Sequence, residues 1–185
     1  MRIIAGEFRG RRIEAPPGRA TRPMLDRVRE ALFSTLQPRL GHAVVLDLFA
    51  GSGSLGLEAL SRGARSVRFV ERSAPALAAL RKNVESLNAR SRVEVLVADA
   101  LKATSWLPAA DVVFLDPPYA LIEESRVRVL GALSTLLATH LASDGIVVLH
   151  VSRGALAAEE LAPARARVRR YGTNDLWYVE CEVGG

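Results

Sequence analysis

Asp116-Pro117-Pro118-Tyr119 brings together groups that suit the recognition of a planar amine. Two prolines stiffen the backbone and remove two N–H donors, so the segment offers a carboxylate and carbonyl oxygens as acceptors. The two hydrogens of an exocyclic nucleobase amine can be held by the Asp116 carboxylate and the Pro117 carbonyl, while the Tyr119 ring stacks on the base. The segment follows an apolar run at 111–115, where the carboxyl end of a strand is expected.

These acceptors address a specific chemical difficulty. An exocyclic amine is a weak nucleophile because its lone pair is delocalised into the ring. Acceptors that hold its N–H groups out of the ring plane favour release of that lone pair for attack on a sulfonium methyl group. Asp116 is expected to stabilise the developing positive charge and to take the proton. The alternative is an ordinary turn at the end of a strand, because Asp-Pro is common in turns.

A glycine-rich loop is predicted between a strand at 43–48 and the helix that follows it. Gly51, Gly53 and Gly56 fit the pattern G-x-G-x-x-G, and Ser52 lies inside it. Glycine lets the main chain approach a ligand closely, and free N–H groups at a helix start can meet electron-rich ligand atoms. The alternative is that these glycines only permit tight packing of strand against helix.

Three acids lie at or near the ends of the predicted strands beside this loop. Glu71 follows Gly51 by twenty residues, where a carboxylate can accept hydrogen bonds from ribose hydroxyls. Asp99 is a candidate to meet an adenine amine, or alternatively to cap a helix that begins at Leu101. Asp47 is expected to position the loop or the amino end of a cofactor. The pattern alone does not separate a dinucleotide from S-adenosylmethionine, because both contain an adenosine ribose.

No metal site is predicted. His42, His140 and His150 have no partners at ligand spacing, and we expect them at strand ends or on the surface. Cys181 is the single cysteine, so the chain has no internal disulfide, and this residue is predicted to be reduced and half-buried in a strand.

All of the net charge of +5 lies in the first 39 residues, which hold nine arginines against four acids. The remainder has sixteen bases and sixteen acids. Such a segment is expected to meet a phosphate backbone, the alternative being a solvated basic arm. Two short strands at 2–5 and 11–14 are predicted to form a hairpin.

A helix is predicted to follow this hairpin, with Thr21-Arg22-Pro23 as its entry. Its apolar face is formed by Leu25, Val28, Leu32 and Leu36, and its polar face by Asp26, Arg27, Arg29 and Glu30.

The rest of the chain alternates between strand and helix. Strands are predicted at 43–48, 67–71, 93–97, 111–115 and 145–149, and helices at 54–62, 74–88, 123–141 and 155–162. The strands are mostly apolar, as is typical of a parallel sheet covered on both faces. Residues 165–171 and 176–183 alternate like an antiparallel hairpin at the sheet edge. The fold class is therefore α/β: a Rossmann-like, mostly parallel seven-stranded sheet with an antiparallel C-terminal hairpin.

The chain is predicted to have one main domain at 21–185, preceded by a basic extension at 1–20. No run approaches the roughly 18 apolar residues of a membrane span, and the first residues lack the pattern of a secretory signal. We therefore expect a cytoplasmic protein that does not enter a membrane, and we expect it to be a monomer.

The full set of motifs resembles the RsmD family. The resemblance rests on residues 2–6, 21–23, 26–33, 46–53, 55–64 and 116–119, and so spans nearly the full length. It implies a methyltransferase that uses S-adenosylmethionine to methylate N2 of one guanine, position 966 in the usual numbering, of bacterial 16S ribosomal RNA in an assembled or assembling small subunit.

The resemblance also implies roles for individual residues. Asp116, Pro117 and Tyr119 would hold the guanine, and Pro118 would lie against the RNA. The cofactor would be held by Asp47, Gly51, Ser52, Gly53, Glu71 and Asp99, and the RNA by Arg2, Arg9, Arg11, Arg12 and Arg22. Two residues depart from the family pattern: Met24 replaces a threonine and His150 replaces a glutamate. Neither is expected to touch the proposed chemistry.

Three other functions remain open. An adenine-N6 or cytosine-N4 methyltransferase acting on DNA or RNA would use the same acceptors, although the chain has no large insertion for reading a DNA sequence. A nicotinamide-dependent oxidoreductase fits the glycine loop but leaves the tetrapeptide unexplained. A non-catalytic RNA-binding module would need only the basic arm.

Overall fold

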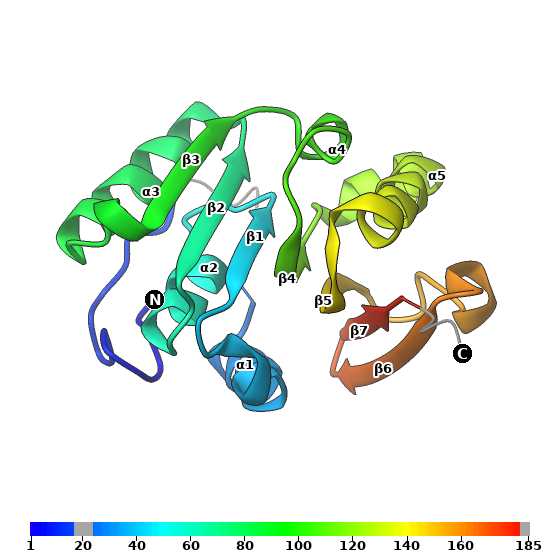
Figure 1. Cartoon of the computed structure of the whole chain (residues 1–185), viewed down its shortest axis with the longest axis horizontal. Coiled ribbons are helices and arrows are strands. Elements are labelled where there is room, and N and C mark those ends of the chain that lie inside the picture. The colour runs from blue at the N-terminus through cyan, green and yellow to red at the C-terminus, as the bar shows by residue number, and fades with distance from the viewer. Residues whose placement is uncertain (17–23, 182–185) are drawn as a thin grey trace.

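Seven strands form one sheet in the order β3-β2-β1-β4-β5-β7-β6 (Figure 1). The structure is a computed structural model that describes residues 1–16 and 24–181. The strands are β1 (Val44–Leu48), β2 (Ser66–Glu71), β3 (Val93–Val97), β4 (Ala110–Leu115), β5 (Leu141–Ser152), β6 (Arg165–Tyr171) and β7 (Asn174–Glu180). The first five are parallel, whereas β7 runs antiparallel to β5 and β6 antiparallel to β7. The predicted fold class, with its antiparallel C-terminal hairpin, is confirmed.

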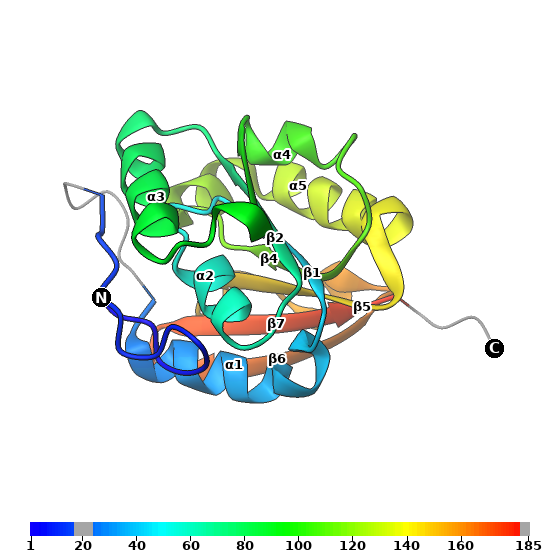
Figure 2. The same ribbon diagram turned by 60° about the vertical axis from the view of Figure 1, so that its left-hand side comes forward.

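Helices cover both faces of the sheet (Figure 2). They are α1 (Asp26–Leu40), α2 (Ser54–Ser61), α3 (Ala74–Ser86), α4 (Ala100–Ala103) and α5 (Tyr119–Thr135). Apolar side chains of α1, α2 and α3 form one core with one face of the sheet, and those of α4 and α5 form a second core with the other. The carboxyl ends of the parallel strands meet at one edge, where ligands of doubly wound sheets bind. No helix in the described part of the chain is both long and apolar enough to cross a membrane.

The pairing of the predicted N-terminal hairpin is confirmed, but its two regular strands are not. Residues 1–16 form a looped arm in which Arg2 and Arg12 make a single antiparallel bridge, flanked by hydrogen bonds from the Ile3 amide to the Arg11 carbonyl at 3.0 Å and from the Ile13 amide to the Met1 carbonyl at 3.1 Å. Other amides of the arm bond to α2: those of Ile4 and Ala5 donate to the buried Glu58 carboxylate at 2.7 and 3.1 Å. The amide of Phe8 donates to Ser61 Oγ at 2.9 Å. The arm is thus attached to the main fold by α2.

The predicted faces of the first helix are wrong at two positions. Leu25 precedes α1 and is 59% exposed, while Arg29 is only 1% exposed. Arg29 points under the arm, where its guanidinium donates to the Arg2 carbonyl and to Asp26 Oδ1. Burial lowers the pKa of Arg29, and the carboxylate of Asp26 opposes that shift. A helical periodicity could not predict this burial because the arm, which is not part of the helix, covers the arginine.

Two predicted boundaries also change. The helix predicted at 155–162 is a short 3₁₀ turn at Ala158–Leu161, since Pro163 keeps the preceding residue out of the helical conformation. The helix predicted to begin at 123 begins at Tyr119, directly after Pro118. The tetrapeptide therefore ends inside the first turn of α5.

The C-terminal hairpin completes the sheet edge. On β6, Arg165, Arg167 and Arg169 are exposed on alternate positions, and charged side chains on an edge strand discourage pairing with another chain. Cys181 follows β7, is partly buried as a free thiol and donates to the Leu137 carbonyl. The segments 17–23 and 182–185, which include Arg22 and the predicted helix entry, lie outside the described residues.

Candidate active site

Asp116 lies directly after β4, at the carboxyl edge of the sheet. Its backbone amide donates to the carbonyl of Leu48, the last residue of β1, at 3.4 Å. Its side chain is partly exposed, and Oδ1 lies 2.7 Å from Nδ1 of His150. One carboxylate oxygen is therefore tied to the protein, which leaves Oδ2 as the oxygen that can face a ligand.

His150 lies near the end of β5, as one of its two predicted placements has it, but its contacts were not predicted. It is only 5% exposed and contacts Asp116, so the expectation that it stays away from the tetrapeptide is wrong. Its Nε2 lies 2.9 Å from Asn174 Oδ1 and 3.3 Å from the Tyr119 hydroxyl. The Tyr119 hydroxyl in turn donates to Asn174 Oδ1 at 2.6 Å. Both ends of the tetrapeptide are thus joined through one imidazole.

Asn174 reaches this cluster because of the C-terminal hairpin. In the register of β5 with β7, Ser152 pairs with Asn174 and His150 with Leu176, so the start of β7 lies beside the end of β5. The sequence places Asn174 only in a turn, and nothing in it predicts that this turn returns to the end of β4.

The charge of Asp116 governs the ionisation of His150. Burial by itself lowers the pKa of His150, but the hydrogen bond and negative charge of Asp116, aided by Asn174, outweigh burial and raise the pKa above its ordinary value. The protonated ring is consequently favoured beside the carboxylate.

The two prolines of the tetrapeptide have different surroundings. Pro117 is buried and Pro118 is exposed. The Pro118 carbonyl accepts the amide of Leu121 at 2.9 Å as α5 begins, so it is engaged by the helix. No hydrogen bond from another described residue reaches the Pro117 carbonyl. The Pro117 carbonyl is therefore the second acceptor of the tetrapeptide that can meet a ligand.

The glycines of the loop serve two purposes. A Cβ on Gly53 would come within 2.4 Å of Leu80, and one on Gly56 within 2.3 Å of Phe69, so both positions are required by packing. Gly51 differs, because it has a φ of +57° and a Cβ there would meet nothing within 4 Å. The packing interpretation holds for two of the glycines, while Gly51 faces open space. Ser52 is buried, and its carbonyl accepts Nδ2 of Asn83 at 2.9 Å.

Glu71, at the end of β2, holds the loop in place. Its Oε2 accepts the Gly51 amide at 2.8 Å, and its Oε1 accepts the amides of Arg72 and Ser73, each at 2.8 Å. A carboxylate has about four lone-pair sites. Three amides therefore leave room for one further donor such as a ribose hydroxyl.

Asp47 is a buried acid beneath the same loop. It is 1% exposed, and its Oδ2 accepts the Gly56 amide at 2.8 Å. Burial raises the pKa of Asp47 well above its ordinary value; the Gly56 hydrogen bond opposes this shift, and the negative charges of Asp116 and Glu71 add to it.

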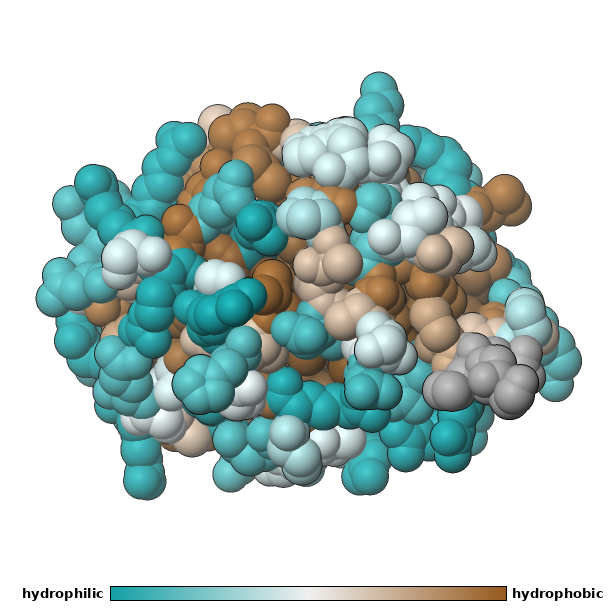
Figure 3. All heavy atoms as spheres, viewed as in Figure 1, coloured by the Kyte–Doolittle hydropathy of each residue, from teal (hydrophilic) through white to brown (hydrophobic). Residues whose placement is uncertain are grey.

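Asp99 caps a helix, as one of its two interpretations predicts. Its side chain accepts the Leu101 amide at 3.0 Å at the start of α4, and Oδ2 pairs with Arg72 at 3.0 Å. Apolar side chains gather at this upper edge of the molecule, over the ends of β2 and β3 (Figure 3). Val97 there is 61% exposed. An apolar surface beside Asp99 and Glu71 suits a planar purine ring.

This edge has the chemistry that S-adenosylmethionine requires. Open space above Gly51 lets a ligand approach the main chain, and Glu71 and Asp99 offer acceptors at the ends of neighbouring strands. Acidic acceptors suit the ribose hydroxyls and the amines that S-adenosylmethionine carries. The residues present therefore fit the cofactor. Among the described residues, no three His, Cys, Asp or Glu side chains are grouped as metal ligands.

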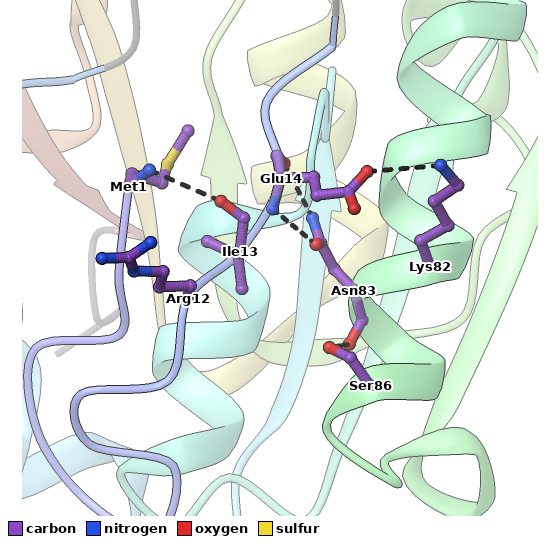
Figure 4. A pocket seen from close by; sticks show the side chains of 7 residues that line it. All are labelled: Met1, Arg12, Ile13, Glu14, Lys82, Asn83 and Ser86. Carbon is purple, nitrogen blue, oxygen red and sulfur yellow. Dashed lines mark hydrogen bonds and ion pairs between the residues drawn. The ribbon is translucent and has the colours of Figure 1, made fainter.

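The arm presents its arginines outward. Arg2, Arg9, Arg11 and Arg12 are all exposed, although Arg11 also donates to the carbonyl of Ser86 on α3. A hollow of about 370 Å³ lies between the arm and α3, lined by Met1, Arg12, Ile13, Glu14, Lys82, Asn83 and Ser86 (Figure 4). None of these residues belongs to the tetrapeptide, so this hollow is separate from the Asp116 edge.

Asn83 connects the arm with the glycine loop. Its Oδ1 accepts the Glu14 amide at 2.7 Å, and its Nδ2 donates to the carbonyls of Glu14 and Ser52, both at 2.9 Å. Sequence reasoning gave no role to Asn83, which lies on a predicted helix with no motif around it, or to Glu58, which lies within the motif at 55–64. The available signal was a polar residue among the apolar residues of a predicted helix.

The sheet order, the glycine loop and the solved structures of the same architecture define a methyltransferase with a Rossmann-like fold. The family model described as conserved hypothetical protein 95 matches residues 1–180, and the chain belongs to that family. This match, together with the relatives below, confirms the resemblance to the RsmD family.

The chain is 36% identical over 159 residues to "Putative rRNA methyltransferase YlbH" of Bacillus subtilis, covering 83% of each chain. It is 44% identical over 123 residues to "Ribosomal RNA small subunit methyltransferase D" of Haemophilus influenzae, covering 64% of each. Among solved structures, "Putative methyltransferase yhhF from Escherichia coli" superimposes with a TM-score of 0.82 at 32% identity, covering 98% of both chains. A "putative methylase HI0767 from Haemophilus influenzae" gives 0.76 at 32% identity, again covering 98% of both.

Proposed function

We propose that this chain transfers a methyl group from S-adenosylmethionine to N2 of a guanine in 16S ribosomal RNA, position 966 in the usual numbering, within an assembled or assembling small subunit. The observation that carries the chemistry is Asp116, whose Oδ1 is held by His150, while no hydrogen bond from another described residue engages its Oδ2 or the Pro117 carbonyl. The names of the Bacillus and Haemophilus relatives support ribosomal RNA as the substrate.

Asp116 and the Pro117 carbonyl would accept the two N–H groups of the amine and direct its lone pair away from the ring. The nitrogen then forms a bond to the methyl carbon as the carbon–sulfur bond breaks, and the electron pair of that bond stays on sulfur. The nitrogen becomes cationic, and Asp116 stabilises that charge before the proton leaves to its carboxylate or to water. Tyr119, whose hydroxyl is held by Asn174, would offer its ring to the base.

S-adenosylmethionine, when bound, supplies the methyl group on a positively charged sulfur. Glu71 would accept from the ribose, Asp99 from the adenine amine, and the Gly51-Ser52-Gly53 main chain would lie along the ligand. Asp47, beneath the loop, would hold the Gly56 amide and so the start of α2 in position. Exposed arginines of the arm, together with Arg22, would meet the RNA backbone.

Substituting Asp116→Asn tests the chemistry. An amide keeps the shape but lacks the charge, so transfer should fall by about 10²–10³-fold, as loss of one preorganised charge-stabilising contact does elsewhere. The measurement is single-turnover transfer of labelled methyl to undermethylated small subunits. Cofactor affinity by calorimetry should remain, and the matched control Asp144→Asn, at an exposed acid remote from the tetrapeptide, should transfer normally.

The same labelling assay separates the competing functions. Mapping the labelled nucleotide distinguishes guanine N2 from adenine N6 or cytosine N4, and labelling of duplex DNA alone would contradict the ribosomal substrate. Binding of NAD without binding of S-adenosylmethionine would favour an oxidoreductase. An Asp116→Asn protein that retains full cellular function would favour a non-catalytic RNA-binding module.

A further inference from the structure

The hydrogen bonds around His150 define its protonation. The side-chain amide of Asn174 is oriented by its own Nδ2, which donates to the Tyr171 carbonyl at 3.1 Å, so Oδ1 is the atom that faces the imidazole. On the other side of the ring, Nδ1 faces Asp116 Oδ1 at 2.7 Å. Both ring nitrogens therefore face oxygen acceptors at hydrogen-bonding distance.

A neutral imidazole can donate from only one of its nitrogens, whereas an imidazolium donates from both. Only the charged ring can therefore donate to Asp116 Oδ1 and to Asn174 Oδ1 at the same time. Asn174 Oδ1 accepts from Nε2 and also from the Tyr119 hydroxyl. That hydroxyl lies 3.3 Å from Nε2 and is a donor that can rotate towards the ring once Nε2 has lost its proton.

We propose that His150 is a positioning residue that holds Asp116 as an ion pair and sets the pH dependence of methyl transfer. This inference rests on the proposed function. With the ring charged, its positive charge partly neutralises Asp116, and the tetrapeptide stabilises a cationic amine less well. When the ring loses its Nε2 proton, Nδ1–H keeps Asp116 in place, the Tyr119 hydroxyl turns to Nε2, and the full charge of the carboxylate faces the amine.

The groups that face this ring come from three elements. Asp116 follows β4, Tyr119 begins α5 and Asn174 begins β7. The next acid along β7, Asp175, is engaged elsewhere, because it accepts the Gly154 amide at 2.9 Å and lies 3.9 Å from Arg170. Asp47, from β1, also interacts electrostatically with Asp116, and burial favours the neutral form of Asp47. Asp116 is thus the charged partner that sets the titration of His150.

These contacts predict the direction in which the rate of methyl transfer changes with pH. Transfer should rise with pH as His150 loses its proton, by on the order of tenfold between the two forms, because one positive charge is removed from beside the developing cation. The inflection should lie above the ordinary histidine range, since Asp116 favours the charged ring.

Nuclear magnetic resonance of the imidazole nitrogens tests the ion pair without any methylation. In the free protein at neutral pH, both ring nitrogens of His150 should carry protons, because each faces an oxygen acceptor. Asp116→Asn should lower the pKa of His150, and Asn174→Asp should raise it. A neutral His150 ring at pH 6, or a pKa that neither substitution moves, would overturn the proposal.

Single-turnover transfer to undermethylated small subunits tests the consequence. The pH inflection should move upward in Asn174→Asp and disappear in His150→Gln, while the control His140→Gln should keep the wild-type profile. An inflection that survives in His150→Gln contradicts the assignment. Absence of transfer to any RNA would contradict the proposed function, and the nitrogen titration would still decide whether His150 and Asp116 form the pair.

Discussion

The carboxyl groups of Asp47, Glu71 and Asp116 lie in one region of the sheet edge and differ in their hydrogen-bond partners. Glu71 accepts three backbone amides, Asp116 is paired with His150, and Asp47 accepts a single amide while almost fully buried. Because burial raises the pKa of Asp47 and its two neighbours add to that shift, Asp47 is the acid whose charged form is least favoured in the folded protein.

Substituting Asp47→Asn should stabilise the folded protein, but only at pH values at which the aspartate would be charged. The pKa of Asp47 in the folded protein exceeds the value of about 4 that it has in the unfolded chain. The stability contributed by the protonated Asp47 is therefore fully present below about pH 4 and is lost as the pH rises through the folded pKa. The variant should therefore unfold a few degrees higher than wild type at about pH 8 and gain nothing at about pH 4. Calorimetric melting at both pH values measures this; an equal gain at both would contradict the assigned ionisation.

Glu71→Gln should weaken cofactor binding by about 10–100-fold, roughly what loss of one or two charge-assisted hydrogen bonds costs. The glutamine places an NH₂ group against backbone amides, so the loop at Gly51 should also loosen and the melting temperature should fall. Titration calorimetry with S-adenosylmethionine measures the affinity. Glu94→Gln, which removes an exposed acid paired with Arg68 on β2 and β3, is the matched control and should bind normally.

At the scale of elements, the strands could be predicted, whereas the attachment of the arm could not. The central strands β1 and β4 are short apolar runs that are almost entirely buried, so their own sequences define them. The arm takes its conformation from Glu58 and Ser61, more than fifty residues away along the chain. Contacts of this kind have no periodicity, which explains why the burial of Arg29 and the attachment of the arm to α2 were not predicted.

The same distinction applies to the candidate site. The tetrapeptide and the glycine loop are continuous in sequence and could be identified there, and the helix cap at Asp99 follows from a local pattern. His150 and Asn174 reach Asp116 only through the register of β5 with β7. A shift of that register by one residue would send His150 to the opposite face, and sequence alone does not define the register.

A pair of glycine substitutions isolates the attachment of the arm. Gly6 and Gly10 both have positive φ, of +84° and +80°, but a Cβ on Gly6 would come within 1.8 Å of the Ser61 carbonyl oxygen and one on Gly10 would meet nothing. Gly10→Ala should cost about 1 kcal/mol of strain. Gly6→Ala should cost clearly more and should also reduce RNA affinity. Denaturant unfolding and RNA binding measure both; equal costs would show that the arm is not held against α2.

At the scale of the whole molecule, the charge is distributed unevenly. The net charge of +5 belongs to the first 39 residues, and the arm that carries part of it lies on the α1–α3 side of the sheet (Figure 2). The exposed arginine Arg128 lies on α5, which packs against the opposite face. The two faces of the sheet should therefore contribute differently to RNA binding.

Replacing Arg9 and Arg12 by alanine should weaken RNA binding and reduce its dependence on salt. Each phosphate contact removed lowers the slope of log affinity against log salt by about 0.7–0.9. Arg128→Ala is the matched control and should leave the slope unchanged. Fluorescence anisotropy with a 16S RNA fragment over a range of salt concentrations measures the slopes, and equal slopes for all three proteins would exclude the arm from the RNA interface.

The hydrogen bonds that hold the arm on Glu58 and Ser61 of α2 have a consequence for the exchange of amide hydrogens with solvent. The amides of Ile4, Ala5 and Phe8 belong to no strand, yet they donate to side chains of α2 that are buried beneath them. Their hydrogens can exchange with deuterium only when the arm separates from α2. The first residues of this chain should therefore show protection close to that of the helix below them, and their exchange rates would report the free energy with which the RNA-facing arm is held.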